Sequence, residues 1–247
     1  MFNHLFSIIL FLPFSLFTQE DLKNYEKYIP ESSCGEIIHY NYYSVSFCED
    51  YKLSEWAIHY LTPDKFGVEK RKNNFRQDPR LKGRDAQESN YYKSGYDKGH
   101  LVPAGDMNYN SISMSESNYM TNISPQHASF NRGGWRVLES KIREWVLEFD
   151  TVAVITGFVK SSKKEDIIDY TNQVPVPKYF YKVFVDIKYN RSIAFLIPNE
   201  KVSKDLFSYV VTIEFLENIT GLDFFYKLSN DEESYLELNS LQNLINR

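Results

Sequence analysis

Two short stretches decide the fold, and the rest of the chain is read outward from them. Residues 94–104 read Ser-Gly-Tyr-Asp-Lys-Gly-His-Leu-Val-Pro-Ala, and residues 131–135 read Asn-Arg-Gly-Gly-Trp. The first stretch predicts a strand that Gly99 interrupts and that ends at Pro103. The second comes 31 residues after His100 and opens a long amphipathic segment. The stretch Tyr91–Phe149 therefore predicts a strand followed by a helix, with polar side chains at the junction.

The segment Gly134–Phe149 has the period of a helix with one buried face. Its apolar residues recur at helical spacing: Leu138, Ile142, Trp145, Val146 and Phe149. A second stripe, four residues apart, consists of Asn131, Trp135, Glu139 and Arg143. Spacing alone leaves two interpretations of this stripe open. It fits a functional face, and it fits a surface helix with an ordinary Glu139–Arg143 ion pair.

The remaining periodic segments predict a mixed α and β protein. Five segments have the pattern of strands: Ile37–Cys48 with a bend at Asn41–Ser44, Trp56–Leu61, Thr151–Val159, Tyr179–Ile187 and Arg191–Ile197. A short strand is expected at Tyr119–Ile123, stopped by Pro125, and a short helix at Thr212–Ile219, closed by Gly221. Without internal repeats or low-complexity linkers, one domain over residues 19–247 is the simplest organisation.

The N-terminus carries the composition of a targeting segment. Met1–Thr18 includes the apolar run Leu5–Phe17, which has no acidic residue and is too short to span a bilayer. We therefore expect a signal peptide over residues 1–18 and a secreted, periplasmic or cell-envelope protein, with no stable membrane span after signal removal. An uncleaved anchor and a buried N-terminal helix are the alternatives.

The chain has only 2 cysteines, Cys34 and Cys48. They are too few for a structural zinc site. In an exported chain they could close a disulfide across a separation of 14 residues. Two unpaired buried thiols are the alternative, and neither cysteine is a catalytic candidate.

Charge is distributed unevenly along a chain whose net charge is −5. Residues 65–84 contain eight basic and two acidic residues, a local +6, whereas residues 200–237 contain three basic and nine acidic residues, a local −6. The basic strip could meet a phosphate backbone, with the acidic segment turned elsewhere. A solvated basic loop is the alternative interpretation.

The polar side chains at the strand–helix junction suit phosphodiester hydrolysis. His100 can act as a base because the reference pKa of histidine, about 6.5, leaves the ring mostly neutral at physiological pH. Asn131 offers a neutral oxygen to Mg²⁺, which prefers oxygen ligands and retains several waters. Glu139 could hold those waters, and Arg143 could take charge from a phosphate. No cluster of histidines and cysteines supports zinc.

At these residues the chain resembles the DNA/RNA non-specific endonuclease family, the ββα-metal nucleases, in an endonuclease G-like form. The family's Asp-Arg-Gly-His signature is present as Asp97-Lys98-Gly99-His100. Its Asn-x-x-Pro-Gln signature is present as Asn122–Gln126, and Asn131 follows nine residues after Asn122. The similarity runs from about Ile37 to Phe225.

The resemblance implies an α+β fold, with a central antiparallel β-sheet flanked by helices and a ββα-metal active-site motif. It implies Asn131 as the direct protein ligand of Mg²⁺ (or Mn²⁺), with Glu139 bound to the metal's water shell. Catalytic roles are implied for His100 as the general base, Glu139, Arg143, Asn122 and an upstream arginine. Arg71 is the first choice for that arginine and Arg76 the second. The implied substrate-binding residues are Asp97, Lys98, Arg71, Arg76 and Arg143.

One residue of the signature departs from the family. Lys98 stands where an arginine is usual, and an ammonium cannot reproduce a bidentate guanidinium fork. If the family's arginine mainly supplies a positive charge, Lys98 can replace it. If the arginine fixes the geometry of the site, we expect the activity to be lower with Lys98. His39, His59 and His127 match no catalytic position, and we interpret them as structural or surface residues.

Together these features predict an exported, Mg²⁺-dependent, sugar-non-specific endonuclease that hydrolyses DNA and RNA. Two alternatives stay open. One is a phosphodiesterase acting on a non-nucleic substrate. The other is a nucleic-acid-binding homologue whose catalysis is weakened, for example through Lys98.

Overall fold

The fold is that of a computed structural model, which describes residues 26–67, 69–160, 167–169, 174–203 and 205–238. Its centre is a seven-stranded sheet in the order β1-β2-β3-β6-β9-β10-β11, and each neighbouring pair is antiparallel. The strands are β1 (Glu36–His39), β2 (Tyr43–Cys48), β3 (Leu53–Leu61), β6 (Val152–Phe158), β9 (Tyr179–Asp186), β10 (Arg191–Pro198) and β11 (Val210–Val211). The predicted antiparallel sheet is confirmed.

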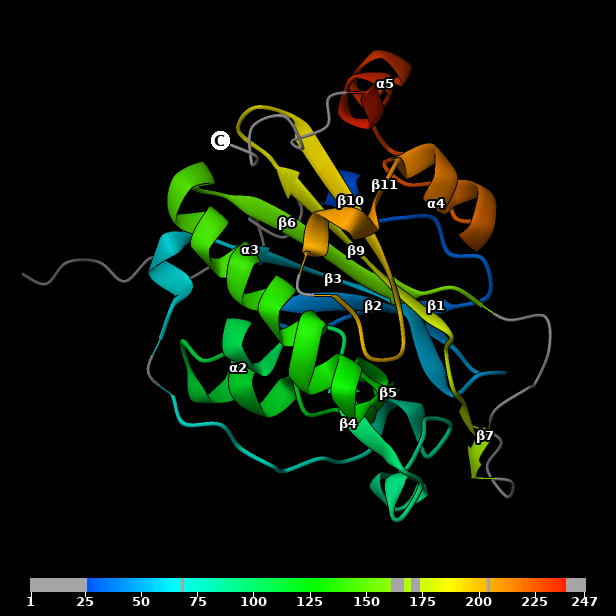
Figure 1. Ribbon diagram of the computed structural model, residues 1–247. Helices are drawn as coiled ribbons and strands as arrows, with labels where there is room; N and C mark the ends of the chain where they lie inside the picture. Colours follow the sequence, from blue (N-terminus) through cyan, green and yellow to red (C-terminus); the bar gives the residue numbers. More distant parts are fainter. Residues whose placement is uncertain (1–25, 68, 161–166, 170–173, 204, 239–247) are drawn as a thin grey trace, which may run out of the picture.

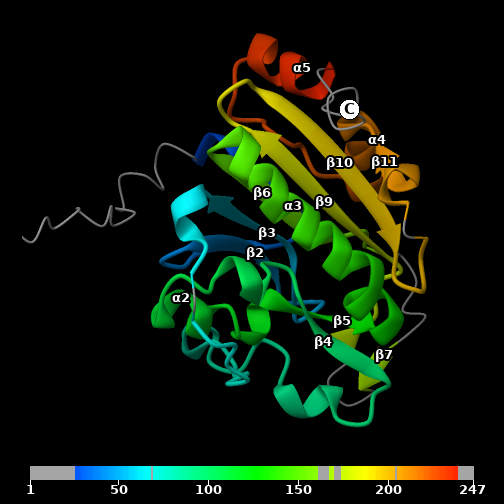
Figure 2. The same cartoon turned by 60° about the vertical axis from the view of Figure 1, so that its left-hand side comes forward.

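Both faces of the sheet are covered, because alternate residues of its strands point to opposite sides. Along β6, Val152 and Val154 belong to one core cluster, whereas Ala153 and Ile155 belong to the other. The helix α3 (Arg136–Phe149) covers the first face, and α4 (Ile213–Thr220) and α5 (Asn230–Leu238) pack on the second (Figures 1 and 2). The sheet therefore forms the middle of a three-layer arrangement.

The strand–helix junction predicted from the sequence forms a separate ββα unit. β4 (Tyr96–His100) pairs with β5 (Ile123–His127), so that His100 lies opposite Ile123 at one end. A π-helical turn, η7 (Phe130–Trp135), leads from β5 into α3. Figure 1 shows the two strands beneath the start of α3, at the edge of the main sheet. The unit places His100 near the first turns of the helix.

Gly99 allows the two strands of this unit to pack closely. A Cβ atom at position 99 would lie 2.1 Å from Cδ of Gln126, which is closer than any real side-chain contact. The space that a side chain at position 99 would need is thus filled by Gln126 of β5.

Most predicted elements agree with the structure; the exceptions are the interruption at Gly99, which lies within the continuous strand β4, the strand at Tyr119–Ile123, and the short elements that no pattern predicted. The helix at Gly134–Phe149 is confirmed, as is the helix ended by Gly221, whose φ is 70°. The strand predicted at Tyr119–Ile123 is wrong: residues 120–122 form a 3₁₀ turn and the strand runs through Pro125. In a two-stranded ribbon a proline can sit with its missing N–H on the open edge. The helices α2 (Ser111–Glu116) and α5 were not predicted, because their sequences are short and mostly polar.

The other short elements connect these layers. They are η1 (Glu26–Tyr28), η2 (Pro63–Lys65), η3 (Pro79–Leu81), η4 (Glu88–Tyr91), η5 (Ala104–Asp106), α2 (Ser111–Glu116), η6 (Met120–Asn122), β7 (Ile167–Asp169), β8 (Val174–Pro175) and η8 (Leu206–Tyr209). The described part of the basic strip at residues 65–84 is mainly an irregular loop.

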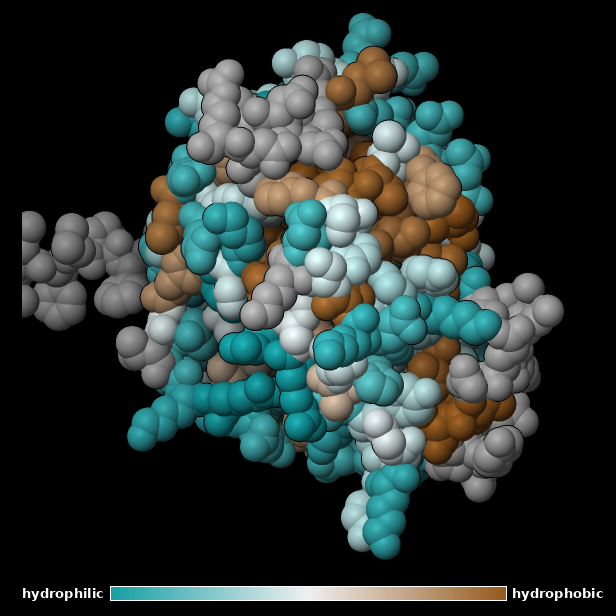
Figure 3. Space-filling model, in the orientation of Figure 1, coloured by the Kyte–Doolittle hydropathy of each residue, from teal (hydrophilic) through white to brown (hydrophobic). Residues whose placement is uncertain are grey.

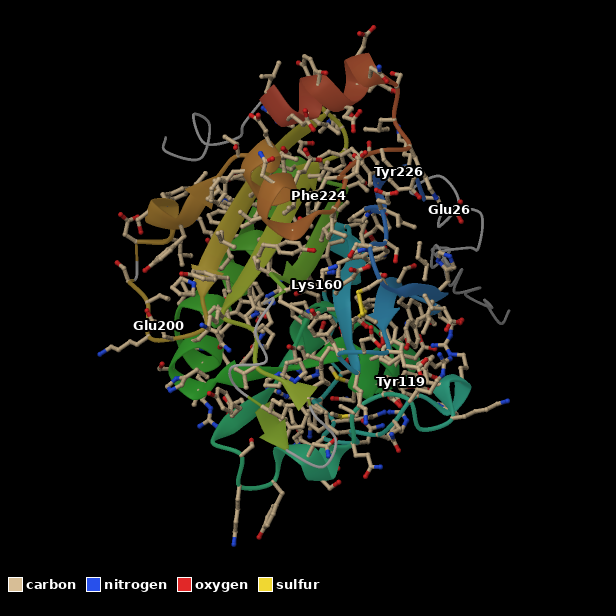
Figure 4. The ribbon with its side chains drawn as sticks, turned by 90° about the vertical axis from the view of Figure 1, so that its right-hand side faces the viewer. Glu26, Tyr119, Lys160, Glu200, Phe224 and Tyr226 are labelled. Atoms are coloured by element: carbon tan, nitrogen blue, oxygen red, sulfur yellow. A yellow bond between two sulfur atoms is a disulfide. The ribbon has the colours of Figure 1, made fainter. Side chains whose placement is uncertain are left out.

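Cys34 and Cys48 form a disulfide, with their Cα atoms 5.4 Å apart, so the open choice between disulfide and thiols is settled. Next to it the buried carboxylate of Glu55 accepts hydrogen bonds from Ser46 Oγ at 2.7 Å and Ser33 Oγ at 2.8 Å, and pairs with Lys160. Figure 4 shows the disulfide beside the labelled Lys160. The disulfide and this network fasten residues 32–35 to the sheet.

The proposed signal peptide at residues 1–18 lies outside the described residues, so the signal, its boundary with the domain and the expected export stay predictions. No helix within the described ranges is long and apolar enough to cross a membrane.

Candidate active site

A cavity of about 310 Å³ opens where β4, η7 and α3 meet the basic loop. It brings together five of the residues singled out in the sequence: Arg71, His100, Asn131, Glu139 and Arg143. The other lining residues are Glu69, Pro103, Ala104, Gly105, Asn108, Met114, Arg132 and Arg136. Figure 3, drawn in the orientation of Figure 1, shows hydrophilic residues gathered in the part of the surface below α3.

His100 lies at the end of β4 with 7% of its surface exposed. Burial and the charge of Arg71 lower the pKa of its imidazole to about 4. Its Nε2 is 3.2 Å from Oδ1 of Asn118, and Asn118 Nδ2 donates to backbone carbonyls at positions 72 and 114. Because the amide oxygen can only accept, Nε2 carries the proton. Nδ1 is then left with a lone pair and can act as a base.

Asn131 is held by a hydrogen bond that determines which of its amide atoms is free. Its Nδ2 donates to Oδ2 of Asp97 at 2.9 Å. A carboxylate only accepts, so the amide nitrogen must face Asp97 and the oxygen must face away. Within the described part of the chain, Oδ1 has no hydrogen-bond partner. The irregular turn η7, which breaks at Gly133 (φ −102°, ψ −117°), sets the direction of this side chain ahead of the regular helix.

Asp97 is fixed in turn by Arg132. Arg132 Nε donates to Oδ2 of Asp97 at 2.8 Å, and its Nη2 donates to Oδ1 at 2.5 Å. Burial alone would raise the pKa of Asp97, but the hydrogen bonds from Arg132 and Asn131 outweigh it and lower that pKa. Asp97 therefore stays ionised and keeps its role as an acceptor from Asn131.

Glu139 follows Asn131 by two helical turns and also lines the cavity. Burial raises the pKa of its carboxyl group to about 7, whereas the nearby positive charge of Lys182 opposes this shift. Lys182 is fully buried in β9 beneath the helix, where its Nζ donates to Thr156 Oγ1 at 2.6 Å and lies 4.6 Å from the centre of the Trp135 ring. The sheet thus supplies a cation behind the carboxylate.

Arg143 is anchored by a chain of buried groups that reaches the middle of the sheet. Its Nη1 donates to Oδ1 of Asp106 at 2.7 Å, and Oδ2 of Asp106 lies 3.0 Å from His59 Nε2. His59, on β3, and Asp106 are buried. Burial lowers the pKa of His59, although its hydrogen bond to Asp106 acts in the opposite direction. The guanidinium group of Arg143 therefore lines the cavity in a fixed orientation.

The two candidates for the upstream arginine separate clearly. Arg71 is exposed, lines the cavity and has no hydrogen-bond partner within the described residues. Arg76 does not line the cavity: it donates to the Ser115 carbonyl oxygen at 2.8 Å and lies 4.1 Å from the centre of the Tyr119 ring. Of the two candidates, the first choice, Arg71, lines the cavity and the second, Arg76, does not; the catalytic role of Arg71 stays a prediction.

Three other residues named from the sequence do not line the cavity. Asn122 is fully buried, and its amide is used by the Val102 backbone (2.9 Å and 3.0 Å) and the Ser117 carbonyl oxygen (2.9 Å). Lys98 pairs with Glu88, and its Nζ lies 4.1 Å from the Phe75 ring centre. Asp97 is bound to Asn131 and Arg132, so each of the three residues is held by protein partners, and none of the three lines this cavity. Their catalytic and substrate-binding roles stay predictions.

Four residues that support the side chains of the cavity were not predicted from the sequence: Asp106, His59, Asn118 and Lys182. No motif in the sequence includes Asp106, and His59 matches no catalytic position of the family. Their spacing carries no signal, because the contacts join β3, β9, η5 and the turn after α2, which lie far apart in the chain.

Comparisons with known proteins relate the chain to nucleases. A family model described as DNA/RNA non-specific endonuclease matches residues 20–231. Nuclease C1 of Cunninghamella echinulata var. echinulata is 32% identical over 205 residues, covering 75% of this chain and 81% of that protein.

Longer relatives are matched over part of their length. The mitochondrial nuclease EXOG of Xenopus laevis is 31% identical over 199 residues, which cover 73% of this chain and 56% of that protein. A chain in the crystal structure of the EndoG/EndoGI complex superposes with a TM-score of 0.76 at 26% identity, covering 89% of this chain and 95% of that one.

Proposed function

The chain belongs to the DNA/RNA non-specific endonuclease family, and we propose that its cavity hydrolyses phosphodiester bonds of DNA and RNA with Mg²⁺ as cofactor. The single observation that carries the proposal is that one cavity is lined by both His100, whose Nε2 is used by Asn118, and Asn131, whose Nδ2 is used by Asp97, so that Nδ1 of the first and Oδ1 of the second are left over. The first supplies a base and the second a ligand for a hard cation.

The donor set fits Mg²⁺. The cavity offers the amide oxygen of Asn131 and the carboxylate of Glu139, both of them hard oxygen donors. Within the described residues no group of three or more histidine, cysteine, aspartate or glutamate side chains could hold a metal. Such a sparse site suits a cation that keeps most of its water. Asn131 would hold the ion directly, and Glu139 would bind through water. Mn²⁺ fits the same donors.

The protein's own groups can divide the reaction between them. His100 Nδ1 would take the proton from the attacking water, and the lowered pKa of His100 keeps this nitrogen unprotonated at neutral pH. Arg143, held by Asp106, and Arg71, from the loop, would bind the phosphate and offset its growing negative charge. Mg²⁺, when bound, supplies further neutralisation at the phosphate and the leaving oxygen.

Lack of discrimination between DNA and RNA follows from the kind of contact that the cavity offers. Arg71 and Arg143 present positive charge to phosphate, which both polymers share. Phosphate contacts position a polynucleotide without reading its bases. Affinity should therefore fall steeply with salt for both polymers.

The direct test is digestion of supercoiled plasmid and of a structured RNA, with Mg²⁺ and with EDTA. We expect both polymers to be cut internally in Mg²⁺ and neither in EDTA. Cleavage of a small diester without cleavage of either polymer would instead show a phosphodiesterase for non-nucleic substrates. Salt-sensitive binding without cleavage would show a homologue that has lost turnover.

We also propose, from the apolar run Leu5–Phe17, that the chain is exported and its first residues removed. N-terminal sequencing of the protein recovered from its native host tests this. A mature protein that begins near Gln19 is expected, and an intact Met1 in the cytoplasmic fraction would contradict export.

A further inference from the structure

We propose that a second cavity beside β4 is a subsite that receives one unstacked base of a single-stranded flank, a few nucleotides from the bond that is cut. The inference rests on the proposed function. The cavity measures about 590 Å³, larger than the catalytic cavity. It is lined by Glu88, Ser89, Tyr91, Tyr92, Lys93, Tyr96, Asp97 and Lys98.

The lining has the chemistry of a base-stacking site. Three tyrosines contribute to it, and Tyr92 exposes 77% of its surface, far more than packing would leave to a structural aromatic residue. Tyr91 exposes only 7%, yet its buried hydroxyl has no hydrogen-bond partner within the described residues. Exposed rings stack on bases of any sequence, and an unpaired buried hydroxyl gains from a polar atom brought by a ligand.

Among the charged residues that line this cavity, Lys93 is the cation that can contact a phosphate of the substrate. Lys98 is paired with Glu88, and Asp97 is paired with Arg132. Lys93 has no ion-pair partner in the part of the chain that the structure describes, and its Nζ lies 5.3 Å from the centre of the Tyr92 ring. Its left-handed backbone (φ 54°) forms the tight turn between η4 and β4. A ring with a lysine beside it matches a nucleotide, which combines a flat base with a phosphate.

The position of the second cavity favours another part of the same substrate as its occupant, over an unrelated ligand. Asp97 lines the second cavity, and its carboxylate holds Asn131, which lines the catalytic cavity. Along β4, His100 belongs to the first cavity and Tyr96 to the second. At about 3.3 Å per residue the two positions lie roughly 13 Å apart, which a polynucleotide covers in a few nucleotides. In a duplex the bases stay stacked, so the occupant is a base of a single strand.

The test compares a substrate that reaches the subsite with one that cannot. Wild type, Tyr92→Ala, Tyr92→Phe and Tyr189→Ala are assayed in Mg²⁺ on a 12-nucleotide single-stranded DNA and on bis(p-nitrophenyl) phosphate. Tyr189 is a matched control, since it is 54% exposed in the β9–β10 turn and lines neither cavity. Tyr92→Ala should raise the KM for the oligonucleotide about 5-fold or more, the lower end for stacking.

Three further results are expected if the subsite exists. Tyr92→Ala leaves hydrolysis of the small diester unchanged, Tyr92→Phe restores the oligonucleotide KM because phenylalanine still stacks, and Tyr189→Ala changes neither. An equal loss on both substrates, or none on the oligonucleotide, overturns the subsite.

A binding measurement separates this inference from the proposed function. The Kd of the same fluorescein-labelled oligonucleotide is measured by anisotropy in EDTA, where hydrolysis is not needed. A Kd about 5-fold weaker for Tyr92→Ala supports the subsite even if wild type cuts nothing. An unchanged Kd refutes it even if wild type is an active nuclease.

Discussion

The two walls of the catalytic cavity are built in different ways. The fixed wall, which comprises His100, Asn131, Glu139 and Arg143, stands on β4, η7 and α3. Three of its four side chains are oriented by hydrogen bonds, to Asn118, Asp97 and Asp106 respectively. The loop wall, which comprises Glu69 and Arg71, comes from an irregular segment, and both residues are exposed.

This difference matches two different tasks. Proton transfer and metal binding tolerate little displacement, and residues on strands and helices with supporting partners are held most accurately. Neutralising the charge of a flexible polymer does not require one exact geometry. It requires a side chain that can follow the phosphate, and an arginine on a loop can do so. The fixed wall should therefore determine the rate of the chemical step, and the loop wall should mainly determine substrate affinity.

The largest effect is expected at His100. Replacing it with alanine removes the base and should lower kcat by about 10²- to 10⁴-fold, with little change in substrate binding. Single-turnover cleavage of a defined oligonucleotide measures this loss. His39→Ala is the control, because His39 lies on the edge strand β1 and pairs with Ser44. A His100→Ala enzyme with a near-normal rate would remove His100 from the mechanism.

Asp106→Asn tests the anchoring of the fixed wall. The neutral amide leaves Arg143 and His59 without their carboxylate, and loss of a buried partner costs about 3 kcal/mol of stability. We expect activity to fall about 10-fold in addition, because Arg143 loses its orientation. Urea unfolding and kcat are measured together.

Asp186→Asn provides the comparison for that variant. Asp186 is also buried and pairs with Arg191 at 2.5 Å, but neither residue lines the cavity. It should lose stability and keep its kcat at temperatures where it stays folded. If both variants lose activity in proportion to stability, Asp106 has no positioning role.

The loop wall is tested by Arg71→Ala beside Arg76→Ala. Arg71→Ala should raise KM more than it lowers kcat, by about 10-fold in kcat/KM, whereas Arg76→Ala should mainly reduce stability. The charge of Arg71 lowers the pKa of His100, so its removal should raise that pKa from about 4 toward its ordinary value. NMR titration of the His100 ring without metal measures the shift. An unchanged or lower pKa would contradict the proximity of the two groups.

The smallest effect is expected from restoring the usual residue at position 98. The ammonium of Lys98 contacts Glu88 and the Phe75 ring and stays outside the catalytic cavity. An arginine can keep the ion pair and the ring contact, so Lys98→Arg should change kcat/KM by no more than about 2-fold. A gain of an order of magnitude would show that Lys98 limits catalysis, in favour of the weakened homologue.

The sequence predicted the parts of this molecule that local patterns encode. The amphipathic helix over Gly134–Phe149 and the long strands followed from periodicity. The family's spacing named four residues that share the cavity, and Arg71, chosen ahead of Arg76 without a fixed register, is the fifth. The supporting residues could not be predicted, because Asp106 and His59 meet only after η5 packs on β3. The same reason explains Asn122, whose place in the signature did not reveal that backbone groups use its whole amide.

A Mg²⁺ titration of Asn131→Ala is the most direct test of the central claim that the fixed wall is the metal and base site. The initial rate of oligonucleotide cleavage is measured against Mg²⁺ concentration, with Asn218→Ala, an exposed change on α4, as control. We expect Asn131→Ala to need at least about 10-fold more Mg²⁺ for its half-maximal rate. Titration curves of wild type and Asn131→Ala with the same midpoint would contradict the claim.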